Sequence, residues 1–228
     1  QGSAATDLDV AINNTLKWAK SKRIVFQTGI QNDAWLTSKV QQALDDSTEL
    51  GNSFFSVAAG NCGDSRTGSG VEIPECYKST SGVAKAALTN TNVASAGGLD
   101  PFDGTLSSLG FDPIIGPANV NSASLTMDVN SHRGDTDGSL TFSLPWQNPD
   151  KVHDSYKLFN GTSNANPNLA GLAALVWAQY PDFTGSELRD VLAHSAMHFT
   201  EDNGGFSNTF GWGFPNADSA VRRGYALA

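Results

Sequence analysis

The first sixty residues alternate twice between a helical and a strand-like pattern. Apolar side chains recur at three- and four-residue steps over residues 8–20, which is the spacing of one face of an amphipathic helix. Residues 23–28 (RIVFQT) follow as a β-branched and aromatic run that ends at Gly29, which predicts a buried strand. The same two patterns recur over residues 35–44 and 54–59. Helix, strand, helix and strand with short connections predict right-handed crossover units on a parallel sheet, and therefore an α/β fold.

The middle of the chain is loop-like. Residues 92–96 predict another short strand, and residues 124–129 one more. The rest of residues 97–157 is rich in Asp, Gly, Pro, Ser and Asn, and this stretch is far longer than an ordinary connection between elements. Loops of this length commonly serve a site or bind an ion.

The last third of the chain predicts three helices. Residues 167–180 are apolar almost all round, which is typical of a buried helix. Two further helical patterns cover residues 185–196 and 216–226. Thr184 or Ser186 would open the first of these, with Glu187 near its start.

Length and charge narrow the class of protein. A chain of 228 residues is long enough for one domain with a substantial core, so residues 1–228 are treated as a single domain. The formal net charge is -9 and the basic residues are scattered singly, which argues against a nucleic-acid partner. The longest apolar stretch, residues 169–178, is about half of what a bilayer span requires, so we predict no membrane span.

Two strings carry polar residues of the kind that chemistry uses. In residues 160–171 (NGTSNANPNLAG), Ser163 precedes the predicted buried helix, where unpaired backbone N–H groups can receive a developing oxyanion. The alternative is an ordinary N-cap at Thr162 or Ser163 with Pro167 in the first turn. In residues 56–63 (SVAAGNCG), a predicted strand ends in small residues and then Asn61, whose amide could donate to an oxyanion. The alternative there is a turn asparagine.

Together these strings resemble the subtilase family of subtilisin-like serine peptidases. In that family a strand ending in A-A-G-N precedes a G-T-S-x-x-x-P helix entry. Residues 8–30 resemble the family's helix and the strand that lines its substrate cleft, and residues 106–110 (LSSLG) resemble its F-S-S-x-G turn. Residues 210–221 (FGWGFPNADSAV) resemble its terminal Y-G-x-G-x-x-N-x-x-x-A segment. The resemblance implies a three-layer subtilisin-like fold with a mostly parallel sheet flanked by helices.

The resemblance also implies roles for individual residues. Ser163 takes the place of the nucleophile of a secreted endopeptidase and Asn61 that of the oxyanion donor, with the Ser163 backbone N–H as second donor. Two segments take the places of the opposite walls that hold an extended peptide substrate. The first wall comprises Thr28, Gly29 and Ile30, and the second comprises Ala58, Ala59 and Gly60.

The chain departs from the family in an important place. The family's triad runs Asp, His and Ser along the chain, but neither its D-[ST]-G strand end nor its H-G-T helix entry occurs here. We therefore expect a partial peptidase domain whose N-terminal crossover units are missing, with the Asp and His on an N-terminal fragment or companion chain. The alternative is an inactive pseudopeptidase that serves as a peptide-binding or scaffold module.

Other histidines offer weaker alternatives. His132 stands in NSHRGDTDG beside Asp135 and Asp137, so it could serve as a base, although the family has no triad member there. His194 and His198 are one helical turn apart and could share a metal, but a solvated helix end explains them as well.

Two further features concern stability. Asp128, Asp135 and Asp137 offer spaced oxygens of the kind that calcium favours, so we predict a structural calcium site, with a plain acidic surface loop as the alternative. No cofactor is otherwise required. Cys62 and Cys76 lie in a polar, Gly-rich segment, and in a secreted protein they predict a disulfide; two reduced thiols are the alternative.

Overall fold

The computed structural model describes most of the predicted helices and strands. The described residues are 7–30, 33–60, 80, 82–99, 142–145, 147–148, 159–160, 162–197, 206–207 and 210–227. Within them, no helix combines the length and the apolarity that crossing a bilayer requires.

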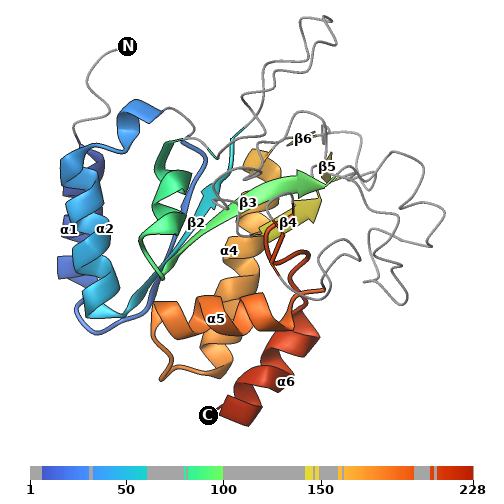
Figure 1. Ribbon diagram of the computed structural model, residues 1–228. Helices are drawn as coiled ribbons and strands as arrows, with labels where there is room; N and C mark the ends of the chain where they lie inside the picture. Colours follow the sequence, from blue (N-terminus) through green and yellow to red (C-terminus); the bar gives the residue numbers. More distant parts are fainter. Residues whose placement is uncertain are drawn as a thin grey trace, which may run out of the picture.

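A parallel sheet lies at the centre of the described residues (Figure 1). Its strands are β1 (Ile24–Thr28), β2 (Ser53–Ala58), β3 (Val93–Leu99) and β4 (Phe142–Pro145), in that order across the sheet. All three pairs of neighbours are parallel, and Thr28 at the end of β1 is in register with Val57 of β2. The parallel sheet predicted from the sequence is therefore confirmed.

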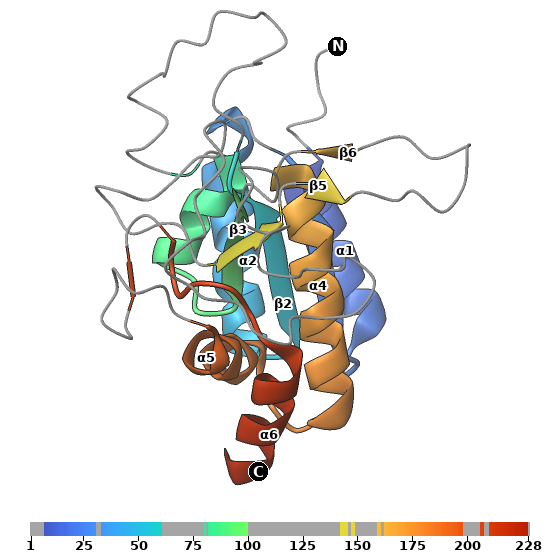
Figure 2. The same ribbon diagram turned by 90° about the vertical axis from the view of Figure 1, so that its right-hand side faces the viewer.

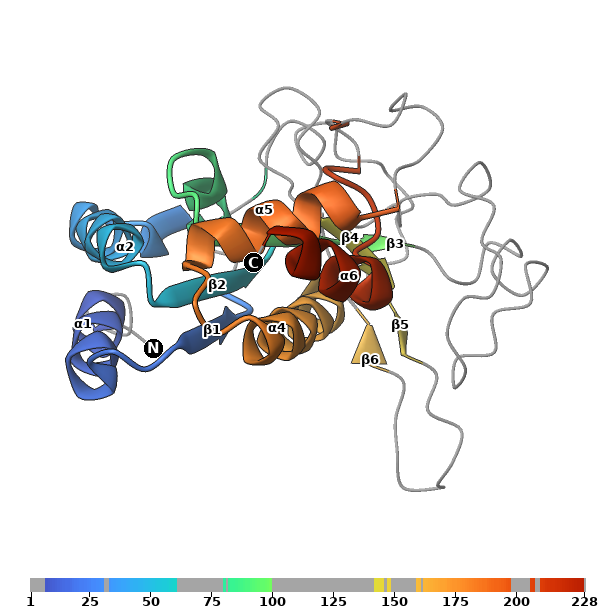
Figure 3. The ribbon, with the colours of Figure 1, turned by 90° about the horizontal axis from the view of Figure 1, so that it is seen from below.

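Helices cover both faces of this sheet. One layer comprises α1 (Leu8–Ala19), α2 (Ser38–Leu50) and the 3-10 helix η5 (Gly82–Leu88). The other comprises α4 (Thr162–Gln179), α5 (Gly185–Ser195) and α6 (Ala217–Leu227). Figures 2 and 3 show α1 and α2 on the opposite side of the sheet from α4. The fold is thus a three-layer α/β arrangement, as the sequence predicts.

Each face of the sheet has its own apolar core. On one face, Phe55 and Val57 of β2 pack with Ile12 of α1 and Leu44 of α2. On the other face, Phe54, Ala94 and Phe142 pack with side chains of α4, α5 and α6. Alternate residues of β2 therefore serve the two cores, and all six residues of this strand are buried.

Several elements differ from the sequence prediction. Trp35 lies in a separate 3-10 turn, η2 (Asp33–Trp35), ahead of α2. The expected loop over residues 97–157 contains β4 and also β5 (Gln147–Asn148), which pairs antiparallel with β6 (Phe159–Asn160). The segments 106–110 and 124–129 lie outside the described residues.

Strand β1 is less buried than predicted. Four of its five residues are partly buried and Gln27 is exposed. In the described part of the sheet β1 occupies one end, and β2 is its hydrogen-bonded neighbour there. The position at the end of the sheet accounts for the exposure.

Helix α4 differs from its prediction at its start and on one face. It begins at Thr162 rather than at Pro167, so Ser163 lies inside the first helical turn. The prediction of burial all round is wrong, because Leu175 is 58% exposed and a Cβ atom built on Gly171 would meet no atom within 4 Å. The helix buries one side against the sheet and presents an apolar side outward.

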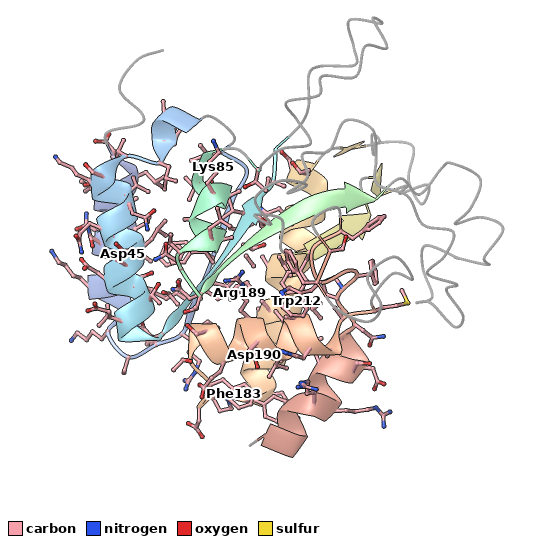
Figure 4. All side chains as sticks on the ribbon, viewed as in Figure 1. Asp45, Lys85, Phe183, Arg189, Asp190 and Trp212 are labelled. Carbon is pink, nitrogen blue, oxygen red and sulfur yellow. The ribbon has the colours of Figure 1, made fainter. Side chains whose placement is uncertain are left out.

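The amino ends of the strands are joined by a network of polar side chains. Asn92, fully buried ahead of β3, donates its amide to Ser47 Oγ at 3.1 Å and to the Ser53 carbonyl at 3.2 Å. Asn90 donates to Asp45 Oδ1 of α2 at 2.8 Å. Figure 4 labels Asp45 and also Arg189, which comes from α5.

Arg189 joins α5 to the end of η5 and to the turn that follows it. It donates to the carbonyls of Ala87 and Asn90, each at 3.2 Å. Burial lowers the pKa of Arg189 to about 10, because the charged form loses solvation there. The two carbonyl oxygens take the place of water around part of the buried cation.

Candidate active site

Three segments that are distant in sequence meet at the carboxyl edge of the sheet. Residues 29–30 follow β1, residues 59–60 follow β2, and α4 begins at Thr162. The Gly60 backbone N–H donates to Thr162 Oγ1 at 3.2 Å, across 102 positions of sequence. This contact holds the end of β2 against the residue that precedes Ser163. In an open α/β sheet, this edge is where ligands bind.

Ser163 lies against the end of β1. A Cβ atom built on Gly29 would lie 3.4 Å from Ser163 Oγ and 3.9 Å from Ser163 Cβ. Any side chain at position 29 would therefore touch the serine hydroxyl, and a branched one would crowd it. Glycine leaves the space beside the hydroxyl open, which is a reason for a residue without a side chain here.

The end of β2 consists of small, buried residues. Ala58 and Ala59 are fully buried, and the Ala59 N–H is bonded to the Ala96 carbonyl at 2.9 Å. Gly60 has a φ of 118°, a conformation that residues with side chains rarely adopt. The chain therefore leaves the sheet sharply at Gly60, directly ahead of Asn61.

A buried asparagine, which the sequence analysis did not single out, ties α4 to both strands. Asn166 is fully buried in the turn after Ser163. Its Nδ2 donates to the Thr28 carbonyl at 2.7 Å, and Ser56 Oγ of β2 donates to its Oδ1 and, at 3.0 Å, to its carbonyl. Its position directly ahead of Pro167 and of the predicted buried helix is the one sequence signal that could have drawn attention to it.

Pro167 follows Asn166 within the helix. Proline lacks the N–H that would otherwise bond to the carbonyl four residues earlier, which is that of Ser163. The helix therefore lacks the backbone hydrogen bond from position 167 to the Ser163 carbonyl. The hydrogen bonds between the Asn166 side chain and the two strands lie next to this position.

Within the first predicted wall, residues 28–30, a hydrogen bond to the Thr28 side chain shapes the backbone. Thr28 Oγ1 accepts from the Ile30 N–H at 3.2 Å, which turns the chain directly after β1. Thr28, Gly29 and Ile30 thus form a compact turn whose middle residue lies at Ser163. The structure brings this segment, Gly60 and Ser163 to one edge of the sheet.

Other predicted site residues lie outside the described residues. These are Asn61, the cysteines Cys62 and Cys76, the acidic set Asp128, Asp135 and Asp137, and the histidines His132 and His198. His194 is described at the end of α5, where its Nδ1 lies 3.0 Å from Asp190 Oδ1. Within the described part of the chain, no three His, Cys, Asp or Glu residues cluster as metal ligands would.

This arrangement suits nucleophilic chemistry at Ser163. The hydroxyl stands at a helix N-terminus, where free backbone N–H groups and the helix dipole favour negative charge. The glycine at position 29 leaves room for a substrate beside it.

Comparison with known proteins identifies the family. The model of the subtilase family matches residues 9–213, which is most of the chain. The chain belongs to the subtilase family. The resemblance inferred from the A-A-G-N and G-T-S strings is therefore confirmed.

Among its relatives is a subtilisin from Bacillus pumilus, which is 30% identical over 149 residues, covering 61% of this chain and 50% of that protein. Subtilisin amylosacchariticus from Bacillus subtilis subsp. amylosacchariticus is 24% identical over 209 residues, covering 88% of this chain and 48% of that protein. The chain thus spans about half the length of the curated relatives it matches.

A solved structure agrees on the fold. Sphericase superimposes with a TM-score of 0.63 at 18% sequence identity, covering 94% of this chain and 64% of that one. The subtilisin-like three-layer fold predicted from the sequence is therefore confirmed.

Proposed function

We propose that this chain is the larger part of a serine endopeptidase in which Ser163 is the nucleophile. The observation that carries the proposal is the meeting of Gly29, the Gly60 turn and the helix start at Ser163 on one edge of the sheet. Membership of the subtilase family supports it.

In the proposed reaction, Ser163 Oγ bonds to the carbonyl carbon of a peptide while its proton passes to a histidine base. The carbonyl oxygen becomes an oxyanion, which accepts hydrogen bonds from the Asn61 amide and the Ser163 backbone N–H. Collapse of this intermediate breaks the peptide C–N bond, and the leaving amine takes the proton from the histidine. Water then attacks the acyl ester on Ser163 and frees the enzyme by the same steps.

The substrate is proposed to lie along the end of β1. An extended peptide could pair with the backbone of Thr28, Gly29 and Ile30, and Ala58, Ala59 and Gly60 would face it from β2. Gly29 would bring the scissile carbonyl next to Ser163.

We propose that the base and its carboxylate partner belong to an N-terminal segment or companion chain outside these 228 residues. The exposed apolar side of α4 at Gly171 and Leu175, together with the end position of β1, offers a surface for such a segment. Burying it would remove apolar area from water and give β1 a second neighbour. The alternative remains a pseudopeptidase that binds peptides without cleaving them.

Secretion, a bridge between Cys62 and Cys76 and calcium at Asp128, Asp135 and Asp137 remain predictions. The bridge would restrain the segment that follows Asn61. Thiol titration of the native protein tests it, because a disulfide predicts no reactive thiol. Thermal unfolding with and without a chelator tests calcium, which would raise the melting temperature if it binds the folded state.

The proposed function is tested with the full-length product of the gene. Its hydrolysis of a casein or peptide substrate is compared with that of a Ser163→Ala variant, and the intact sample is analysed by mass spectrometry for a further fragment. We expect hydrolysis by the unmodified protein, none by the variant, and an H-G-T string in the additional sequence. Peptide binding without hydrolysis would favour the pseudopeptidase.

A further inference from the structure

The buried amide of Asn166 joins the three segments of the candidate site. Its side chain accepts from Ser56 of β2 and donates to the carbonyl of Thr28 at the end of β1. Asn166 itself stands in α4, three residues after Ser163. Residues three apart on a helix share a face, so Asn166 and Ser163 present the same side of α4 to the strand ends.

An amide satisfies both partners at once without a change of protonation state. The Thr28 carbonyl can only accept and therefore needs a donor, which Nδ2 provides at 2.7 Å. The Ser56 hydroxyl donates to Oδ1 on the other side of the same planar group. An ionised carboxylate of the same shape would serve Ser56 but would turn an oxygen toward the Thr28 oxygen.

The position of Asn166 directly before Pro167 makes the helix start depend on these hydrogen bonds. Pro167 removes the hydrogen bond to the Ser163 carbonyl and disfavours helical backbone at the residue before it, which is Asn166. The helix start that carries Ser163 therefore depends on contacts outside the helix. Asn166 itself is fully buried and its bonds with Ser56 are buried, while its bond with Thr28 is partly buried.

We infer that Asn166 is a positioning residue that fixes the turn of Thr28, Gly29 and Ile30 against Ser163. Through the Thr28 carbonyl it sets the gap between Gly29 and the serine hydroxyl, which is the space that a substrate carbonyl would enter. This inference rests on the proposed function for its catalytic consequence. Its geometric part, the restraint on residues 28–30, can be measured without any activity.

The test uses three variants of the full-length protein. Asn166→Asp keeps the shape and changes the donor, whereas Asn166→Ser shortens the side chain so that it no longer reaches the Thr28 carbonyl. The matched control is Asn92→Asp, because Asn92 is equally buried and also donates to a backbone carbonyl, that of Ser53, but at the amino edge of the sheet. If Asn166→Asp does not fold, the same measurements on Asn166→Ser still test the inference.

Three quantities are measured for each variant. These are kcat and KM on a peptide substrate, hydrogen exchange of the backbone over residues 24–30, and the midpoint of denaturant unfolding. We expect the Asn166 variants to lose about 10²-fold in kcat, the scale of an error of about 1 Å in placement, with a smaller change in KM. Exchange at residues 28–30 should rise in the same variants. Asn92→Asp should lower the unfolding midpoint while the folded enzyme keeps its kcat.

Two results would overturn the inference. One is an active wild-type enzyme whose Asn166 variants keep kcat and keep slow exchange at residues 28–30. The other is a rise in exchange spread evenly over the chain, as in Asn92→Asp, which would make Asn166 merely structural. A wild-type protein without hydrolysis contradicts the proposed function instead, and exchange at residues 28–30 then still decides whether Asn166 holds this turn.

Discussion

Buried asparagines have different roles at the two edges of the sheet. At the amino edge, Asn92 and Asn90 belong to a dense network in which polar groups of α2 and the strand starts bond to one another. At the carboxyl edge, among the residues that the structure describes, Asn166 bonds to Thr28 and Ser56 beside Gly29, the glycine that lies against Ser163. At the amino edge the side chains of Asn90, Asn92, Ser47 and Thr48 bond to one another, whereas at the carboxyl edge Gly29 places no side chain beside the Ser163 hydroxyl.

This difference assigns separate roles to the two ends of the same strands. The amino edge contributes to the stability of the fold, and the carboxyl edge holds the candidate active site. A filled, satisfied network contributes to the free energy of unfolding and presents little to a ligand. An edge that keeps backbone groups and a hydroxyl accessible contributes less to stability and can bind a substrate. Substitutions at the amino edge should therefore change unfolding, and those at the carboxyl edge should change activity.

After loss of the nucleophile itself, the largest expected effect on activity comes from Asn61→Ala. Loss of an oxyanion donor should lower kcat by about 10²–10³-fold, or about 2.7–4 kcal/mol, a magnitude measured on a subtilisin and so taken from the same family. The unfolding midpoint should stay close to that of the unmodified protein. The measurement is steady-state hydrolysis of a peptide substrate together with denaturant unfolding. An unchanged kcat would remove Asn61 from the site.

Gly29→Val tests the open space beside Ser163. A Cβ atom at this position already reaches to 3.4 Å from the serine hydroxyl, so two further methyl groups should displace a substrate and lower kcat/KM by about 10²-fold. Gly29→Ala is the matched control, because its single methyl group makes an ordinary contact and should cost much less. Equal kcat/KM for the valine and glycine proteins would contradict the proposed substrate path.

Asn92→Ala tests the amino edge. The substitution leaves the Ser53 carbonyl and neighbouring hydroxyls without their buried partner, which should lower the free energy of unfolding by about 1–3 kcal/mol. Denaturant unfolding measures this loss, and peptide hydrolysis at low denaturant should be unchanged. A loss of kcat in the folded variant would break the separation between the two edges.

The smallest expected effect concerns the start of α5. Thr184 Oγ1 accepts from the Glu187 N–H at 3.2 Å and the Glu187 carboxylate accepts from the Thr184 N–H at 2.7 Å, which is a capping box. Thr184→Ala should lower the free energy of unfolding by about 1 kcal/mol. Hydrolysis should not change, because this helix start lies at the amino edge.

The same capping box predicts a pH dependence. The hydrogen bond from the Thr184 N–H holds the pKa of Glu187 below its ordinary value of 4.5. The carboxylate therefore stabilises the fold above pH 4.5 and loses this contribution as the pH falls through its lowered pKa. In unfolding titrations, Glu187→Gln should lose less stability than the unmodified protein over that acidic range. Identical pH profiles would contradict the assignment.

Much of the fold could be predicted from the sequence because its signals are local. The periodic pattern of α1, the apolar run of β2 and the capping residues of α5 each depend on neighbours in the chain, and each was predicted within a few residues. Strand β4 was missed, because its partner β3 is distant in sequence and its four residues include a proline. The 3-10 helix η5 is too short to show a period.

The site could be predicted only in part. Ser163 and Gly29 follow from strings that resemble a family, but the role of Asn166 depends on where Thr28 and Ser56 lie in space. An asparagine before a proline ordinarily predicts a turn or a helix boundary. The buried bonds that keep it within a helix are made across 110 and 138 positions of sequence, which no local pattern can indicate.

The central claim is that the carboxyl edge holds a reactive serine at position 163. The most direct measurement is labelling of the full-length protein with a fluorophosphonate, followed by digestion and mass spectrometric mapping of the modified residue. The account predicts one modified serine, Ser163, with labelling abolished in Ser163→Ala and retained in a Ser47→Ala control at the amino edge. Labelling of a different serine, or none in a folded protein that contains the additional segment, would contradict it.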